Sequence, residues 1–281
     1  METKQIIKRA LRYIVKGVPI KIVKADIHYT LPTDKLKGKS VIVTGGGRGL
    51  GFAMAKRFAG EGAKVLIAGR NEEILRHSAD EIGCPYLRLD MQDPTSFASF
   101  IQQADEMLGG GLNCLVNNAG ISLHEDGFLS VSQEQYDSQF DTNLKGPFFL
   151  TQAFVEYCNS HHTEGTKDVL FTSSETGMTV DERPYGLSKA ALNSLVQGLA
   201  YRYVGEGYRI NAIAPGVTLS DMVGKKDEDN LVLDGTATGR YYLPDEIAEV
   251  ASFLLSDASN CLNGQILVCN EGKTINARWK S

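Results

Sequence analysis

The chain has 281 residues, of which 42% are hydrophobic and 22% charged, so it is long enough to bury the core of one large α/β domain. Its formal net charge of −5 divides into +6 over residues 1–38 and −11 over residues 39–281. An acidic body of this kind argues against a nucleic-acid-binding domain, and no nucleic acid is expected as a partner.

The cysteines, histidines and apolar runs argue against a disulfide-stabilised protein, a metal-binding protein and a membrane-spanning protein. Five cysteines without C-x-x-C spacing do not suggest a disulfide framework and fit a reducing, cytoplasmic setting. The histidines form no H-E-x-x-H or comparable cluster, so no metal is predicted. No apolar run approaches the ~20 residues of a membrane span, and no signal peptide is visible.

Residues 1–38 form an extension ahead of the first predicted strand. Apolar residues recur there at helical spacing between basic ones and predict a basic amphipathic helix; they are Ile6, Ile7, Ala10, Leu11, Ile14 and Val15. Such a helix either lies on an anionic membrane surface or packs as an arm on its own body or on a neighbouring subunit. The arm is favoured, because one short helix is a weak membrane anchor.

The next segment, residues 40–51, joins a buried strand, a glycine-rich turn and the start of a helix. Residues 41–43 are apolar and β-branched, and a helical pattern begins at Phe52. Glycines let the backbone approach phosphates closely, and a helix N-terminus offers unpaired N–H groups and a positive dipole end. The segment therefore predicts a phosphate-binding turn, whose candidate residues are Gly45, Gly47, Arg48, Gly49, Leu50 and Gly51.

Beyond this turn, apolar runs of strand length alternate with helical patterns. Strands are predicted at 41–43, 64–68, 86–89, 112–116, 168–171, 209–213 and 265–268, and helices include 94–108, 151–159, 189–204 and 244–255. Regular alternation implies right-handed crossovers and a parallel sheet. We expect a Rossmann-like, doubly wound parallel sheet of about seven strands with helices on both faces. This three-layer α/β/α domain spans residues 39–281.

The end of the second predicted strand bears on the choice of cofactor. In dinucleotide-binding units an acidic residue some 20 positions beyond the glycines bonds the ribose 2′-hydroxyl and selects NAD. Here Gly69 and Arg70 stand at that point, and Arg48 lies in the glycine turn. Either arginine alone is typical of a solvated surface charge. Together they can pair with a 2′-phosphate, so NADP(H) is favoured over NAD(H).

Several motifs at strand ends resemble those of the short-chain dehydrogenase/reductase family. They are Thr-Gly-x-x-x-Gly-x-Gly at 44–51, Asn-Asn-Ala-Gly at 117–120, an Asn-bearing segment at 142–146, Thr-Ser-Ser at 172–174, Tyr-x-x-x-Lys at 185–189 and Pro-Gly at 215–216. They occur in family order over about residues 38–275. Ligands of open parallel sheets bind at the carboxyl ends of the strands, where these motifs fall.

The resemblance implies an NADP(H)-dependent oxidoreductase that interconverts a carbonyl and a secondary alcohol by hydride transfer. Tyr185 would be the general acid/base, with a pKa lowered by the nearby ammonium of Lys189. Ser174 would hydrogen-bond the substrate oxygen, and Asn143 would hold a water in a proton relay. The resemblance also implies dinucleotide contacts from Asp90, Met91, Asn118, Ala119, Gly120, Tyr185, Lys189, Pro215, Gly216 and Thr218.

Two other functions remain open, as does the substrate. The chain can be a catalytically silent dinucleotide-binding sensor of the same fold, or a reductase recruited to a membrane surface by residues 1–38. Specificity is expected from 122–127, 178–184 and 220–242. The first two stretches are polar, which mildly favours a polar or sugar-like small molecule. The family resemblance implies a homodimer or homotetramer formed through the long helices after the fourth and fifth strands.

Overall fold

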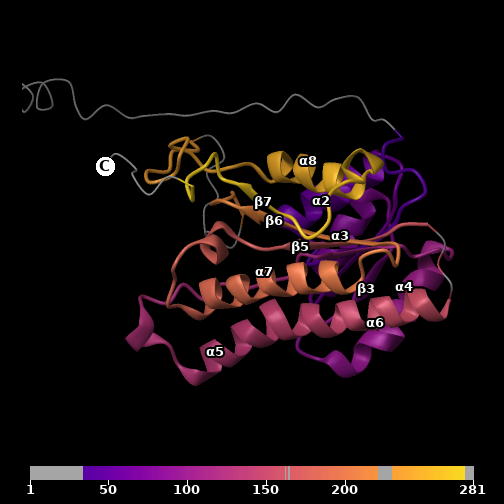
Figure 1. Cartoon of the computed structure of the whole chain (residues 1–281), viewed down its shortest axis with the longest axis horizontal. Helices are drawn as coiled ribbons and strands as arrows, with labels where there is room; N and C mark the ends of the chain where they lie inside the picture. Colours follow the sequence, from indigo (N-terminus) through magenta and orange to yellow (C-terminus); the bar gives the residue numbers. More distant parts are fainter. Residues whose placement is uncertain (1–33, 162, 164, 221–229, 276–281) are drawn as a thin grey trace, which may run out of the picture.

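The computed structural model describes residues 34–161, 163, 165–220 and 230–275. One sheet of seven parallel strands, in the order β3-β2-β1-β4-β5-β6-β7, runs through its centre (Figure 1). The strands are β1 (Ser40–Thr44), β2 (Lys64–Gly69), β3 (Tyr86–Arg88), β4 (Cys114–Asn117), β5 (Lys167–Thr172), β6 (Tyr208–Pro215) and β7 (Ile266–Cys269). The doubly wound parallel sheet predicted from the sequence is confirmed.

Successive side chains of each central strand enter two different hydrophobic cores. In β1, Ile42 packs in one core, whereas Val41 and Val43 pack in the other. Side chains alternate between the two faces of a strand, so a strand that is covered on both faces needs apolar residues at every position. This explains the continuous β-branched run that the sequence shows there.

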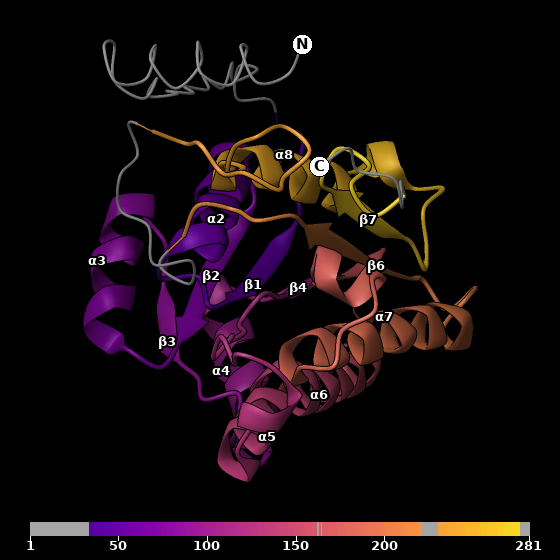
Figure 2. The same ribbon diagram turned by 90° about the vertical axis from the view of Figure 1, so that its left-hand side faces the viewer.

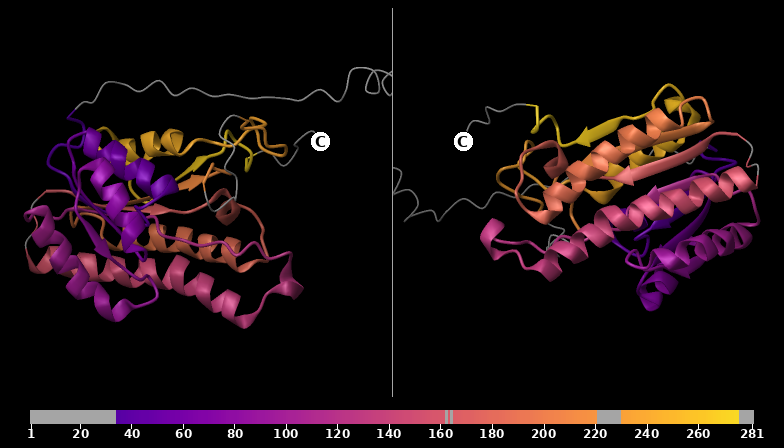
Figure 3. Two further views of the ribbon diagram at one scale, coloured as in Figure 1. Left: turned by 180° about the vertical axis from the view of Figure 1, so that it is seen from behind. Right: turned by 60° about the horizontal axis from the view of Figure 1, so that its bottom comes forward.

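Two layers of helices cover the sheet (Figures 1 and 2). On one face lie α2 (Gly49–Gly60), α3 (Glu72–Ile82) and α8 (Pro244–Leu255). On the other face lie α4 (Phe97–Leu108), α6 (Gly146–Ser160) and α7 (Pro184–Arg202). The helix α5 (Gln133–Phe140) continues through a π-helical turn, Asp141–Lys145, into α6, so that the three form one long rod (Figure 3).

Several boundaries differ from those predicted. The helices predicted over 151–159 and 189–204 begin earlier, at Gly146 and Pro184. Proline fits the first turn of a helix, because the N–H that it lacks has no partner there. As a result Tyr185 lies in the first turn of α7. The third strand ends at Arg88, one residue before the predicted end at 89, so Asp90 and Met91 lie in the segment just beyond it.

The N-terminal extension falls almost wholly outside the described residues, which begin at 34. The predicted amphipathic helix lies there. Of the described part, Leu36 is fully buried, and its N–H donates to the carbonyl of Glu61 at 2.9 Å. Within the described residues, no helix combines the length and apolarity that crossing a membrane requires.

A cluster of buried charges closes the amino-terminal edge of the sheet. Asp168, at the start of β5, is 2% exposed and lies 2.6 Å from Lys39 Nζ and 2.7 Å from Arg209 Nη2. Removing one partner of a buried pair leaves the others unpaired, and this typically costs about 3–5 kcal/mol.

We expect Asp168→Ala to lower the free energy of unfolding by about 3–5 kcal/mol, measured by chemical denaturation. The control is Asp34→Ala, which removes an exposed pair with Lys37 at 3.3 Å and should have little effect. Equal stabilities of the two variants would contradict the structural importance of the buried cluster.

Candidate active site

After β1 the chain continues to β2 and β3 on one side of the sheet, and after β4 it continues to β5, β6 and β7 on the other side. A cavity of about 850 Å³ lies at the carboxyl ends of β1 and β4, where the two directions diverge. This volume suits a cofactor together with a small substrate. Every site residue predicted from the sequence lines the cavity except Asn143: Gly45, Gly47, Arg48, Gly49, Leu50, Gly51, Arg70, Asp90, Met91, Asn118, Ala119, Gly120, Ser174, Tyr185, Lys189, Pro215, Gly216 and Thr218.

The glycine turn has no room for side chains. A Cβ on Gly51 would lie 2.2 Å from the carbonyl oxygen of Gly45 and 2.5 Å from Nδ2 of Asn118. Arg48 is the N-cap of α2, and its side chain makes no capping hydrogen bond to the first turn. A close backbone approach next to a helix N-terminus fits the pyrophosphate of a dinucleotide.

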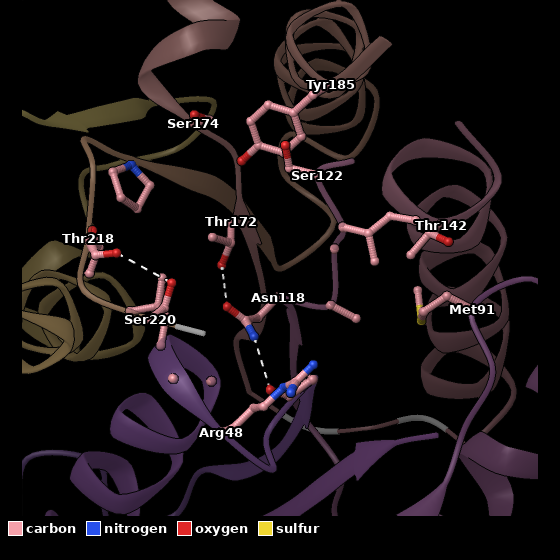
Figure 4. A pocket seen from close by; sticks show the side chains of 18 of the residues that line it. Arg48, Met91, Asn118, Ser122, Thr142, Thr172, Ser174, Tyr185, Thr218 and Ser220 are labelled. Atoms are coloured by element: carbon pink, nitrogen blue, oxygen red, sulfur yellow. Dashed lines mark hydrogen bonds between the residues drawn. The ribbon is translucent and has the colours of Figure 1, made fainter. Parts of the chain in front are cut away.

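Asn118 ties together the ends of three strands. Its side-chain Nδ2 donates to the carbonyl of Thr44 at 3.0 Å, and its Oδ1 accepts from Thr172 Oγ1 at 3.2 Å. The backbone N–H groups of Asn118 and Ala119 donate to Thr44 Oγ1 at 3.0 and 3.1 Å. The side chain of Asn118 therefore braces β1, β4 and β5 from within the cavity wall (Figure 4).

Two arginines lie at the end of the cavity nearest the glycine turn and β2. Arg48 and Arg70 are both exposed and both line the cavity. Arg70 follows Gly69, the last residue of β2, and Asn71 caps α3 by accepting from the N–H of Ile74 at 3.0 Å. The end of β2 therefore carries a cation, and no carboxylate stands at Gly69, Arg70 or Asn71.

Asp90, Met91 and the segment after β6 form other parts of the wall. Oδ1 of Asp90 accepts from the N–H of Gln92 at 3.0 Å, while Met91 is buried against α6. Gly216 donates its N–H to the carbonyl of Cys269 at 3.0 Å. Thr218 donates its hydroxyl to the carbonyl of Gly216 at 2.9 Å, which fixes the turn after β6.

Tyr185 and Ser174 lie together at the opposite end of the cavity from Arg48 (Figure 4), and Lys189 lines the same cavity. Tyr185 and Lys189 are one turn apart on α7, with Lys189 Nζ 5.7 Å from the tyrosine ring centroid. Nζ donates to the carbonyl of Thr172 at 2.8 Å. Ser174 follows β5, and its Oγ accepts from Thr176 Oγ1 at 3.0 Å.

Burial controls the pKa values of Tyr185 and Lys189. It raises the pKa of the Tyr185 phenol, and a hydrogen bond with Ser174 partly opposes this. It also lowers the pKa of Lys189 from 10.5 to about 8. The sequence led us to expect a lowered pKa for Tyr185, and in this structure that expectation is wrong. The physical reason is that desolvation of the phenolate outweighs the other effects.

Asn143 lies beside the cavity, in the π-helical turn between α5 and α6. Its Oδ1 accepts from the N–H of Ile121 and its Nδ2 donates to the carbonyl of Ile121, both at 2.8 Å. Nδ2 also lies 3.3 Å from Ser188 Oγ. A Cβ on Gly120 would lie 3.2 Å from Asn143 Oδ1 and 3.5 Å from Lys189 Nζ, so only glycine keeps this space open. π-helical turns of this kind often occur at functional sites.

The cavity wall also contains charged residues that the sequence did not single out as site residues. Glu125 follows β4, Glu175 follows Ser174, and Arg183 precedes α7. Asn270 Nδ2 and Lys273 Nζ donate to the two oxygens of Glu175 at 2.9 and 2.8 Å. Glu125 and Arg183 fall within the stretches predicted to set specificity, which was the only signal pointing to them. Within the described residues, no group of His, Cys, Asp and Glu has metal-ligand geometry.

Comparison with known proteins gives consistent matches over this region. The family model described as Enoyl-(Acyl carrier protein) reductase, a short-chain dehydrogenase/reductase model, matches residues 45–274. Oxidoreductase UcpA of Salmonella typhimurium is 34% identical over 261 residues, which cover 86% of this chain and 96% of that protein. A tropinone reductase homolog of Arabidopsis thaliana is 31% identical over 260 residues, covering 88% and 97%.

A solved structure is similar to this chain over the same region as the family model and the two relatives. The short chain dehydrogenase from Burkholderia cenocepacia in complex with NADP is similar with a TM-score of 0.74 and 28% identity, covering 85% of this chain and 99% of that one. With the parallel sheet, the glycine turn and the Tyr-x-x-x-Lys helix in place, these matches show that the chain is an oxidoreductase that belongs to the short-chain dehydrogenase/reductase family.

Proposed function

We propose that this enzyme interconverts a carbonyl and a secondary alcohol with NADP(H) as cofactor, in the cavity at the carboxyl edge of the sheet. The observation that carries the proposal is that Tyr185 and Ser174, with Lys189 Nζ 5.7 Å from the tyrosine ring centroid, lie at one end of a cavity whose other end is a glycine turn. A bound nicotinamide dinucleotide supplies or accepts the hydride. The chain itself supplies binding, orientation and the transfer of a proton.

The proton moves through Tyr185. In reduction, the phenol donates its proton to the carbonyl oxygen, and in oxidation the tyrosine removes the proton of the alcohol. Ser174 donates a hydrogen bond to the same oxygen and stabilises the charge that develops there. Lys189 would hold the nicotinamide ribose, and it supplies a positive charge near the phenol. Asn143 Oδ1 and Lys189 Nζ both lie close to Gly120, where a relay water would connect the site to solvent.

The reaction is tested by following NADPH consumption with a panel of aldehydes and ketones. Consumption that depends on the carbonyl compound supports the proposal. The rival function is a silent dinucleotide sensor, for which NADPH would bind without turnover on any member of the panel. The chain keeps all four residues proposed to take part in proton transfer, Asn143, Ser174, Tyr185 and Lys189. This favours an enzyme, because a sensor does not need them.

The preference for NADP(H) rests on Arg48 and Arg70, which supply two cations where the 2′-phosphate would lie. We expect the double variant Arg48→Ala/Arg70→Ala to raise the Kd for NADPH about 10²- to 10⁴-fold, since it removes two charge-assisted hydrogen bonds that each contribute about 1.5–3 kcal/mol. The Kd for NADH should change little, because NADH lacks this phosphate. Calorimetric titration measures both constants.

The matched control is Arg76→Ala, which removes an exposed arginine of α3 outside the cavity wall. This variant should bind NADPH as the wild type does. If the double variant loses affinity for NADPH and NADH equally, the arginines do not recognise the 2′-phosphate.

We propose that the enzyme assembles as a homodimer or homotetramer. Phe148 and Phe149 at the start of α6 are 44% and 39% exposed, which supports a contact there. Other apolar residues of these two helices do not support such a contact, since Leu150 and Phe154 on α6 and Leu192 and Val196 on α7 are buried in the monomer core. The polar wall residues near Tyr185 support a polar small molecule as substrate.

A further inference from the structure

Two oppositely charged side chains, Glu125 and Arg183, line the same cavity as Tyr185. Glu125, in the loop after β4, is 7% exposed. Arg183, the residue before α7, has a side chain that is 43% exposed. A carboxylate buried to this degree needs partners for its oxygens, so its surroundings indicate what it is built to bind.

Glu125 is fixed from the side away from solvent by a neutral amide. Gln139, fully buried on α5, donates from Nε2 to Oε1 of Glu125 and accepts from the N–H of Leu123 at 3.3 Å. Asn143 fixes the start of the same loop through Ile121. Among the described residues, the other oxygen, Oε2, has no hydrogen-bond partner, so the carboxylate keeps an acceptor for a ligand.

Arg183 is fixed in a similar way by a carboxylate. Its Nε and Nη2 donate to the two oxygens of Asp181, both at 2.9 Å, and Asp181 also accepts from the backbone N–H of Arg183 at 3.1 Å. Within the described part of the chain, Nη1 makes no hydrogen bond. The guanidinium therefore keeps donors for a ligand. Its pKa is raised, chiefly by the hydrogen bond with Asp181, and the charge of Glu125 adds to the effect.

We propose that Glu125 and Arg183 form a hydroxyl-binding subsite, and that the substrate is a vicinal polyol or the matching hydroxy-carbonyl compound. A hydroxyl group next to the reacting carbon can donate to Oε2 of Glu125 and accept from Nη1 of Arg183. This inference rests on the proposed function, because it adds a neighbouring group to the alcohol on which Tyr185 acts.

Charge favours a hydroxyl over ionic groups at this point. A carboxylate or phosphate on the substrate would be repelled by Glu125, whose hydrogen-bond partner, Gln139, is a neutral amide. An ammonium group would be repelled by Arg183 and Lys189. A neutral hydroxyl satisfies both side chains, since it donates one hydrogen bond and accepts another.

The reaction is balanced as an oxidation by NADP⁺. One carbinol C–H bond breaks, and its hydride passes to the nicotinamide. The O–H bond of the same carbinol breaks, and its proton passes to Tyr185 and then to solvent. The neighbouring hydroxyl stays intact on the resulting hydroxy-ketone.

The test compares trans-cyclohexane-1,2-diol with cyclohexanol, which differ by one hydroxyl, as substrates with NADP⁺. We expect kcat/KM of the wild type to favour the diol, and Glu125→Leu to lower the diol-to-monool ratio about 10- to 100-fold, the effect of one hydrogen bond to a charged group. Glu125→Gln, which keeps an acceptor, should lower the ratio less. The control Glu182→Leu replaces an exposed neighbour outside the cavity wall and should leave the ratio unchanged.

A ratio near one in the wild type, or a ratio unaffected by Glu125→Leu in a variant that still gains thermal stability from NADPH, overturns the inference. So does a wild type that reduces simple ketones but oxidises neither probe. The proposed function fails differently: no carbonyl or alcohol is then turned over at all, or Tyr185→Phe leaves turnover of both probes unchanged.

Discussion

Replacing Tyr185 by phenylalanine is expected to lower kcat for carbonyl reduction about 10²- to 10⁴-fold, the usual contribution of a general acid. The ring stays in place, so packing against Ser174 and the rest of the wall is kept and only the proton donor is lost. The Kd for NADPH should remain within about threefold of the wild-type value, because the phenol contributes one of many contacts. Steady-state kinetics and calorimetry measure the two effects separately.

The matched control is Tyr201→Phe, on the same helix, where the side chain is 85% exposed. It should behave as the wild type in both measurements. Turnover by Tyr185→Phe at the wild-type rate would remove the tyrosine from the mechanism.

Because burial raises the pKa of Tyr185, the phenol form prevails at neutral pH in the free enzyme. Reduction should therefore proceed at pH 7, and the rate of oxidation should increase as the pH rises.

Lys189→Met is expected to abolish most of the activity and at the same time to stabilise the fold. Burial lowers the pKa of Lys189 from 10.5 to about 8, which corresponds to a cost of about 3 kcal/mol for holding the charged form in the native state. The hydrogen bond from Nζ to the Thr172 carbonyl, at 2.8 Å, returns about 1 kcal/mol. Methionine keeps the length of the side chain without the charge, so the variant should gain about 1–2 kcal/mol at pH 7.

The stabilisation expected from Lys189→Met should decrease as the pH rises. Below about pH 8 lysine is protonated in both the folded and the unfolded chain, and the full cost applies. Between about 8 and 10.5 the unfolded chain binds more protons than the folded one, so the stability of the wild type rises with pH through this window. Lys189→Met lacks this contribution, and its advantage should shrink as the pH rises.

Denaturant unfolding at pH 7 and pH 9.5 measures the difference. Lys56→Met, which replaces a lysine that is 58% exposed on α2, serves as the control and should show no such pH dependence. A Lys189→Met variant that is less stable than the wild type at pH 7 would contradict the cost assigned to the buried ammonium.

Much of the cofactor cavity could be predicted because its signals are local in the sequence. Gly51 lies in the first turn of α2, shortly after a buried strand, and its lack of a side chain is required by the carbonyl of Gly45. Likewise Tyr185 and Lys189 are four residues apart on one helix. Strand ends of a parallel sheet meet at one edge, so motifs at those ends converge without any knowledge of the packing.

The substrate end of the cavity was less predictable, because it depends on contacts between segments far apart in the chain. Gln139 reaches Glu125 only because α5 packs over the loop after β4. The sign of the pKa shift at Tyr185 was missed for a related reason: desolvation depends on everything that covers the side chain, and the spacing to Lys189 does not reveal it. The π-helical turn that holds Asn143 likewise has no signature in composition or periodicity.

The binding of NADP(H) in this cavity is tested most directly by titrating the purified protein with NADPH and NADH while recording the melting temperature. A ligand present at 100 times its Kd stabilises the folded state by about 2.7 kcal/mol, which raises Tm by roughly 5–10 °C in a chain of this size. We expect NADPH to produce this shift at a far lower concentration than NADH. An equal response, or a stronger one to NADH, would contradict the roles of Arg48 and Arg70, and no shift with either at millimolar concentration would contradict cofactor binding in the cavity itself.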